Sequence, residues 1–120
     1  MADHLLKFKP GQAVTFTAST AIVGGNVVEV TGNRTVGVPA GAASTKTIGS
    51  AAHDAASADS VIVHLNGPVD TFISAAAITA GASVENATVG KIQAATSGRI
   101  LGIALTAATG ADQTVQVLRA

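Results

Sequence analysis

Residues 48–65 read IGSAAHDAASADSVIVHL, and a similar segment, LGIALTAATGADQTVQVL, occupies residues 101–118. The two segments align without a gap. Each begins with a strand that contains glycine, continues through a loop of small residues to Ala-Asp, and ends in a β-strand. The identical pairs include Gly49/Gly102, Ala51/Ala104, Ala55/Ala108, Ala58/Ala111 and Asp59/Asp112. The repeat predicts one structural unit, strand–loop–strand, that is used twice.

An aspartate, Asp59 or Asp112, ends the loop of each copy. Aspartate side chains accept backbone N–H bonds in turns that lead into strands, which is the role expected for both. His53 and Asp54 do not recur, because the second copy has Thr106 and Ala107 at those positions. What repeats is therefore interpreted as architecture.

Serine, histidine and aspartate occur together in this segment, which makes a hydrolytic site a function to consider. The candidates are Ser50 or Ser57 as nucleophile, His53 or His64 as base, and Asp54 or Asp59 as the orienting acid. The sequence has no Gly-x-Ser-x-Gly motif, and the adjacent His53 and Asp54 would project to opposite sides of an extended strand. We expect no catalytic residues and interpret the chain as a protein that is not an enzyme.

No metal or cofactor site is expected either. The chain has no cysteine, and His4, His53 and His64 lack the HxxxH or HxH spacing of zinc ligands. Neither GxxxxGK[ST] nor GxGxxG is present, so Gly24-Gly25 is expected to form a turn. His64 is expected to face outward between Val63 and Leu65.

Alternation with a period of two residues extends outward from the repeat and predicts an all-β fold. Turn residues recur every 8–12 positions, as in a small β-sandwich or β-barrel of about nine short strands. Residues 39–45 are expected to be a loop, and residues 73–80 a strand end or one short helical turn. Besides the glycine-containing strand that opens the first repeat copy, strands are expected at 14–18, 27–30, 35–38, 61–65, 69–74, 84–87, 91–94, 100–105 and 114–118.

Asn66-Gly67 lies between two of these apolar runs. Both residues accept positive φ at low cost, so the dipeptide predicts a β-hairpin that joins strands 61–65 and 69–74. Pro68 has no N–H to donate and is expected at a strand start or an edge.

Length and composition indicate one small domain with a thin core. The chain has 120 residues, of which 48% are hydrophobic, but its aromatic residues are three phenylalanines alone. Alanine contributes much less burial energy than a large side chain, so such a domain gains stability by packing against another chain. We expect an N-terminal arm at 1–10, a single β-rich domain at 11–120, and an obligate assembly.

Charge argues against several partners. Seven basic and seven acidic residues give a formal net charge of zero, with no basic patch and no Trp or Tyr for base stacking. Nucleic acid and membrane are therefore not expected as partners, and the N-terminus does not resemble a signal peptide. The scattered basic residues Lys46, Lys91, Arg34, Arg99 and Arg119 are expected to be solvated.

The order of several segments resembles that of tailed-bacteriophage head decoration, or cement, proteins. The resemblance covers Lys9 to Arg119. It is carried by KPGQAVTFTASTAIVGGNVVEVTGN, TVGVPAG, IGSAAHDAASADSVIVHLNGPV, ISAAAITAGASVE and GRILGIALTAATGADQTVQV.

The resemblance implies a β-rich virion protein without cofactor or small-molecule substrate. Such a protein binds the major capsid protein on the outer surface of the mature capsid, as a homotrimer at threefold or quasi-threefold positions, and stabilises the shell by cross-linking neighbouring capsomers. It would be made in the host cytoplasm. The resemblance assigns the capsid or subunit contact to the arm residues Leu5, Leu6, Lys7, Phe8, Lys9 and Pro10.

Other virion roles stay open at this point. A tail-tube or baseplate component would also be β-rich and oligomeric. A displayed adhesion or carbohydrate-binding module is less compatible with a chain that has no Trp or Tyr, because sugar-binding surfaces usually need exposed aromatic side chains.

Overall fold

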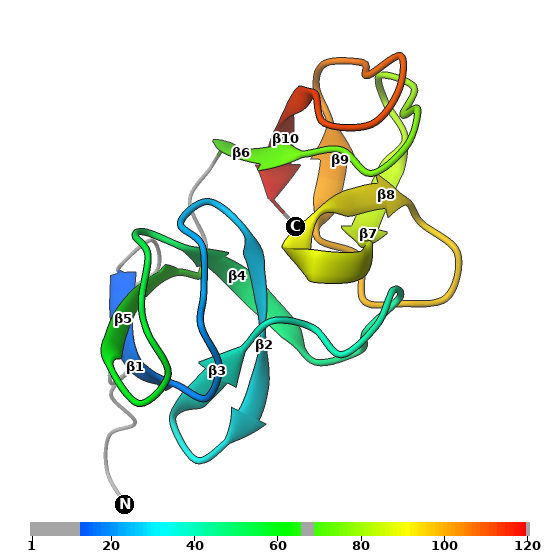
Figure 1. Cartoon of the computed structure of the whole chain (residues 1–120). Coiled ribbons are helices and arrows are strands. Elements are labelled where there is room, and N and C mark those ends of the chain that lie inside the picture. Colours follow the sequence, from blue (N-terminus) through cyan, green and yellow to red (C-terminus); the bar gives the residue numbers. More distant parts are fainter. Residues whose placement is uncertain (1–12, 66–68, 120) are drawn as a thin grey trace, which may run out of the picture.

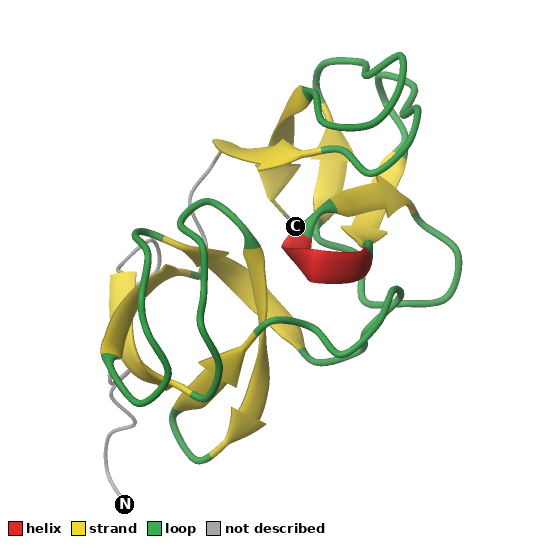
Figure 2. Ribbon diagram, viewed as in Figure 1, coloured by secondary structure: helices red, strands yellow, loops and turns green. Residues whose placement is uncertain are grey.

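The computed structural model describes residues 13–65 and 69–119. These residues form ten short strands and one 3-10 turn, η1 (Thr88–Gly90) (Figures 1 and 2). The expected all-β class is confirmed. The strands are β1 (Ala13–Ala18), β2 (Val27–Gly32), β3 (Thr35–Gly37), β4 (Thr47–Ala51), β5 (Ser60–His64), β6 (Val69–Ile73), β7 (Ser83–Asn86), β8 (Ile92–Ala94), β9 (Gly102–Ala104) and β10 (Thr114–Arg119).

The strands form two five-stranded sheets that follow one pairing scheme. In the first, β1-β3-β2-β4-β5 close into a barrel, in which β1 pairs antiparallel with β5 and parallel with β3. In the second, the order is β6-β10-β9-β7-β8, and a parallel bridge between Ser74 and Ile92 corresponds to the β1–β3 pairing. We call residues 13–65 the first unit and residues 69–119 the second unit; Figure 1 shows them as two adjacent bodies.

Equivalent positions extend beyond the repeat that the sequence reveals. Strands β6 and β7 follow β1 and β2 at a constant interval, which aligns Phe16 with Phe72, Ile22 with Ile78 and Glu29 with Glu85. Ile22 pairs with Ala55 as Ile78 pairs with Ala108. Gly25 and Gly81 are also equivalent, and both adopt the positive φ that favours glycine.

The gapless alignment holds for β4 and β9 but shifts by one residue before the last strand. Val61 pairs with Phe16, and Val115 pairs with Phe72, so Val115 rather than Thr114 is the equivalent of Val61. The loop of the second copy is therefore one residue longer. As a result, the positive φ in the two loops falls at Ala58 and at Asp112, and Asp59 and Asp112 are not equivalent.

Each unit has its own core, built from alternate strand positions. The first contains Ala18, Ile22, Val28, Val36, Ala51, Val61 and Val63. The second contains Phe72, Ile78, Val84, Ile92, Leu101, Ala104, Ala108, Val115 and Val117, joined by Val27 from β2 of the first unit. Val27 is fully buried, so the units share apolar packing across their junction.

One local prediction is wrong, and another is decided between its two alternatives. Strands β5 and β6 do not form a hairpin, because β5 pairs with β1 and β4 whereas β6 pairs with β10. In each unit the first strand pairs with the last strand, and this long-range pairing overrides the local preference of Asn66-Gly67 for a hairpin turn. Residues 66–68 themselves lie outside the described residues. Of the two alternatives expected for residues 73–80, the structure has the strand end, since β6 ends at Ile73 and the backbone of Ser74 and Ile78 is paired with other strands and loops; the one short helical turn described lies at 88–90.

Candidate functional site

The polar side chains of residues 50–60 hold loops in place. The amide of Ile62 donates to His53 Nε2 at 3.2 Å, and His53 Nδ1 lies 2.8 Å from the carbonyl oxygen of Asp54, so both ring nitrogens face backbone groups. Asp54 accepts from the Gly24 amide at 2.8 Å. Ser57 Oγ donates to the Ser19 carbonyl at 3.1 Å, away from His53. The side chains of His53, Asp54 and Ser57 thus each contact backbone groups rather than one another.

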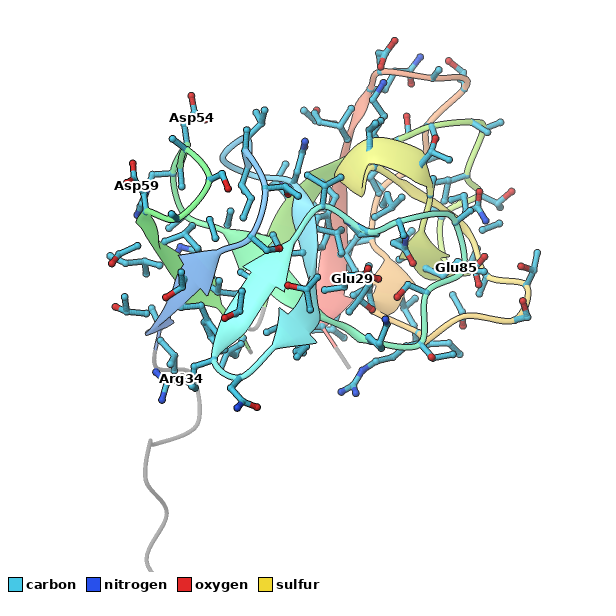
Figure 3. All side chains as sticks on the ribbon, turned by 60° about the horizontal axis from the view of Figure 1, so that its bottom comes forward. Glu29, Arg34, Asp54, Asp59 and Glu85 are labelled. Carbon is cyan, nitrogen blue, oxygen red and sulfur yellow. The ribbon has the colours of Figure 1, made fainter. Side chains whose placement is uncertain are left out.

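The expected role of the loop aspartates takes a different form. Asp59 is exposed, and it is the Asp59 carbonyl that accepts a hydrogen bond, from the Ala18 amide. The Asp112 carboxylate binds Lys91 Nζ. Asp54 and Asp59 lie on the loop at the periphery of the first unit, as Figure 3 shows. His64 is exposed, as expected. Within residues 13–65 and 69–119, no group of three or more histidine or acidic residues could hold a metal ion.

Two buried glutamates that were not predicted from the sequence, Glu29 and Glu85, occupy equivalent positions in β2 and β7. Figure 3 shows both inside the body of the molecule. Glu29 accepts from Ser44 Oγ at 2.6 Å and from the Ala40 amide at 3.2 Å. Glu29 therefore binds the loop between the third and fourth strands of the first unit, and Glu85 binds the corresponding loop of the second unit. The sequence feature that could have identified these glutamates is a Val-Glu pair, which occurs at matching places in the two halves of the chain. Both pairs lie outside the repeat segments.

Glu85 is fully buried and has more partners than Glu29. Its carboxylate accepts from Gln93 Nε2, from Thr96 Oγ1, and from the amides of Thr96, Ser97 and Gly98, at 2.7–3.1 Å. Burial raises the pKa of Glu85, but the hydrogen bonds from Thr96, Gln93 and Gly98 outweigh it and lower the pKa from 4.5 to about 2. The ionised carboxylate is thus the anchor of the loop at 95–99.

Arg119 connects the two units and is not solvated as expected. Its guanidinium donates to the carbonyl oxygens of Ile48 and Leu65 in the first unit, at 3.3 and 3.2 Å. It also lies 3.4 Å from Asp70 Oδ2, which accepts from Ser50 Oγ of the first unit at 2.7 Å. The Arg119 side chain is 5% exposed, and this burial lowers its pKa while Asp70 opposes the shift.

A second set of contacts lies where the loop at 39–46 meets the second unit. Asn86 Oδ1 accepts from the Ser44 amide at 2.7 Å, and Asn86 Nδ2 donates to the Gly41 carbonyl at 2.9 Å. Gly98 packs closely on the backbone of Ala43. A Cβ atom added to Gly98 would lie 2.5 Å from the Ala43 carbonyl carbon. With Val27 and Arg119, these contacts fix the two units against each other.

The proposed arm residues, Leu5 to Pro10, lie outside the described residues. Among the described ones, no helix is long and apolar enough to cross a membrane. The functional features that the structure does describe are therefore the paired units, their junction, and the surfaces that they expose.

Comparison with known proteins identifies the family. A family profile described as phage cement protein matches residues 8–119. The chain belongs to the phage cement protein family. It is therefore a structural protein of a phage virion that associates with the capsid, in agreement with the resemblance found in the sequence. No curated protein matches the chain.

A solved structure supports the fold. The crystal structure of the head fiber gp8.5 N base of bacteriophage phi29 matches this cement protein with a TM-score of 0.70 and 15% sequence identity. The match covers 91% of this chain and 93% of that one, so both units and their arrangement are included. At this identity the likeness concerns the fold.

Proposed function

We propose that this cement protein binds the outer surface of the mature capsid and strengthens the shell by linking neighbouring capsomers. The observation that carries the proposal is the match of the phage cement family to nearly the whole chain, residues 8–119. The partner is the major capsid protein, and the protein itself is a homotrimer at threefold or quasi-threefold positions.

The structure is compatible with this mechanical role. Two units with separate cores are held by Val27, Arg119 and the loop at 39–46, so a force applied to one unit passes to the other. Zero net charge allows many copies to pack closely on a shell. A modest interface repeated over the lattice stabilises the state it prefers by mass action.

Co-sedimentation tests the binding. Purified protein is mixed with expanded heads and, as a control, with immature heads. We expect saturable binding to expanded heads only, at a fixed ratio to the major capsid protein, and a higher temperature of DNA release from decorated heads. Equal binding to both kinds of head, or to neither, contradicts the proposal.

The arm is proposed to supply part of the contact through its apolar residues. Removal of residues 1–9 should leave the fold intact and weaken shell binding. The triple change Leu5→Ser, Leu6→Ser, Phe8→Ser should do the same, whereas the control Lys7→Gln, Lys9→Gln should bind expanded heads nearly as well as the wild type. Wild-type affinity in the truncated chain refutes a role for the arm.

A further inference from the structure

The second unit carries a row of exposed apolar side chains across three adjacent strands. Leu118 in β10 pairs with Val69 in β6 on one side and with Ile103 in β9 on the other. Residues directly opposite in antiparallel strands point to the same face. Val69, Ile103 and Leu118 are 49%, 45% and 45% exposed, and the nearby Leu105 is 46% exposed. We call these four residues the apolar wall; β6, β10 and β9 lie side by side in Figure 1.

The first unit acts as an internal control for this surface. At the equivalent positions it has Ala13, Ser50, Ala52 and His64, where the pairings Ala13–His64 and His64–Ser50 repeat those of the wall. The same strand arrangement is thus stable with small or polar residues there. The large apolar side chains of the second unit are not required by the fold and call for another explanation.

Within the chain, one edge of the equivalent surface of the first unit is already an interface, whereas Ala13, Ala52 and His64 are exposed. Val27 and Ser50, which pair across β2 and β4, are 0% and 2% exposed. Val27 packs into the core of the second unit, and Ser50 donates to Asp70 of that unit. The corresponding pair in the second unit, Ser83 and Ile103, is exposed.

We infer that the apolar wall is the surface through which one copy of this protein binds a second copy, with the contact centred on Ile103, whose equivalent Ser50 is buried against the second unit within the chain. The wall and its neighbours Ser83, Thr71 and Gln116 carry no charge, which suits the centre of a protein interface. A zero net charge adds no long-range repulsion between copies.

Such a contact is heterologous, because the wall of one copy meets a different surface of the next. Contacts of this type close into a ring when the rotation between copies allows it. The inference thereby deepens the proposed function, since it rests on the proposed homotrimer and names its surface.

The experiment measures self-association by sedimentation velocity over a wide range of protein concentration. The variant Ile103→Ser, Leu105→Ala gives the wall the residues that the first unit has at those positions. The matched control is Ile62→Gln, which replaces a side chain 40% exposed in the first unit with the residue at the equivalent position of the second, Gln116. Thermal unfolding of each variant checks that the fold is retained.

We expect the wild type and Ile62→Gln to form the same closed oligomer. We expect the wall variant to weaken self-association by about tenfold or more, because two apolar side chains no longer leave water on assembly. A wild type that stays monomeric overturns the inference, as does a wall variant with unchanged association.

Shell binding separates this inference from the proposed function. A monomeric wild type that still binds expanded heads overturns the wall as a self-contact and leaves the cement role in place. A wall variant that keeps its oligomeric mass but loses shell binding assigns the wall to the capsid protein and also overturns the inference. If the wall variant self-associates more weakly than the wild type, the interface is supported. If the wild-type oligomer at the same time binds no heads, that result counts against the cement role.

Discussion

Glu85 determines the conformation of an entire loop from one buried position. Its carboxylate accepts hydrogen bonds from side chains and amides between Gln93 and Gly98, and no described residue places a cation against it. A buried charge is stable only when its hydrogen-bonding capacity is satisfied, and here the loop satisfies it. The loop and the glutamate therefore depend on each other.

Glu85→Gln should lower the free energy of unfolding by about 2–3 kcal/mol, because the amide group turns a donor toward the donors of the loop. Urea denaturation followed by circular dichroism measures the change. The control Asp59→Asn, at an exposed position, should leave the midpoint unchanged. Equal midpoints for the two variants would show that the loop does not depend on the charge.

The same carboxylate predicts a dependence of stability on pH. Its pKa is about 2 in the folded protein and about 4.5 when unfolded, so between these values the unfolded state binds more protons. The contribution of Glu85 to stability is complete above about pH 4.5 and is lost as the pH falls toward 2. Urea midpoints measured from pH 6 to 2.5 should decline more steeply for the wild type than for Glu85→Gln; parallel curves would contradict the assignment.

At the scale of elements, the fourth strand of each unit needs glycine where it meets the last strand. A Cβ atom at Gly49 would lie 2.1 Å from the carbonyl oxygen of His64, and one at Gly102 would lie 2.0 Å from that of Leu118. These are equivalent positions, and backbone atoms cannot move aside as a flexible side chain can. The two glycines are conserved between the copies for a steric reason.

Gly49→Ala and Gly102→Ala should each destabilise the protein by about 1–3 kcal/mol, the usual range for overpacking. Gly41→Ala and Gly110→Ala are matched controls, because a Cβ atom at either position meets nothing within 4 Å. Thermal unfolding compares the four variants. Similar melting temperatures across the set would mean that the strands separate to accept the methyl group at little cost.

Element positions were predictable from sequence to the extent that local patterns decide them. The alternation around Val14 and Phe16 places β1 correctly, and the small-residue repeat identifies β4–β5 and β9–β10. Strand pairing is not local, so the Asn66-Gly67 signal suggested a hairpin between strands that belong to different units. The roles of Glu85 and Arg119 were also not predictable, because their partners lie on loops and strands that only the fold brings near.

On the scale of the whole molecule, the junction makes two similar units into one body. Arg119 is central to it, since its guanidinium binds two carbonyl oxygens of the first unit and lies beside Asp70 of the second. The planar guanidinium presents five N–H donors in a fixed arrangement and so serves several separated acceptors at once. The carbonyls of Ile48 and Leu65 accept from it, and it is the cation beside the Asp70 carboxylate, which also accepts from Ser50 Oγ.

Arg119→Met should therefore lower the free energy of unfolding by about 3–5 kcal/mol, because it leaves a partly buried carboxylate and two carbonyls without this donor. It should also weaken the coupling between the units, so that hydrogen exchange followed by mass spectrometry detects separate opening of residues 13–65 and 69–119. Arg99→Met is the control, since Arg99 is exposed and its bond to the loop at 39–46 comes from the backbone amide. If Arg119→Met and Arg99→Met unfold alike and in one step, Val27 and Asn86 alone are enough to hold the units together. In that case the two units are coupled through the packing of Val27 and the contacts of Asn86 rather than through the arginine.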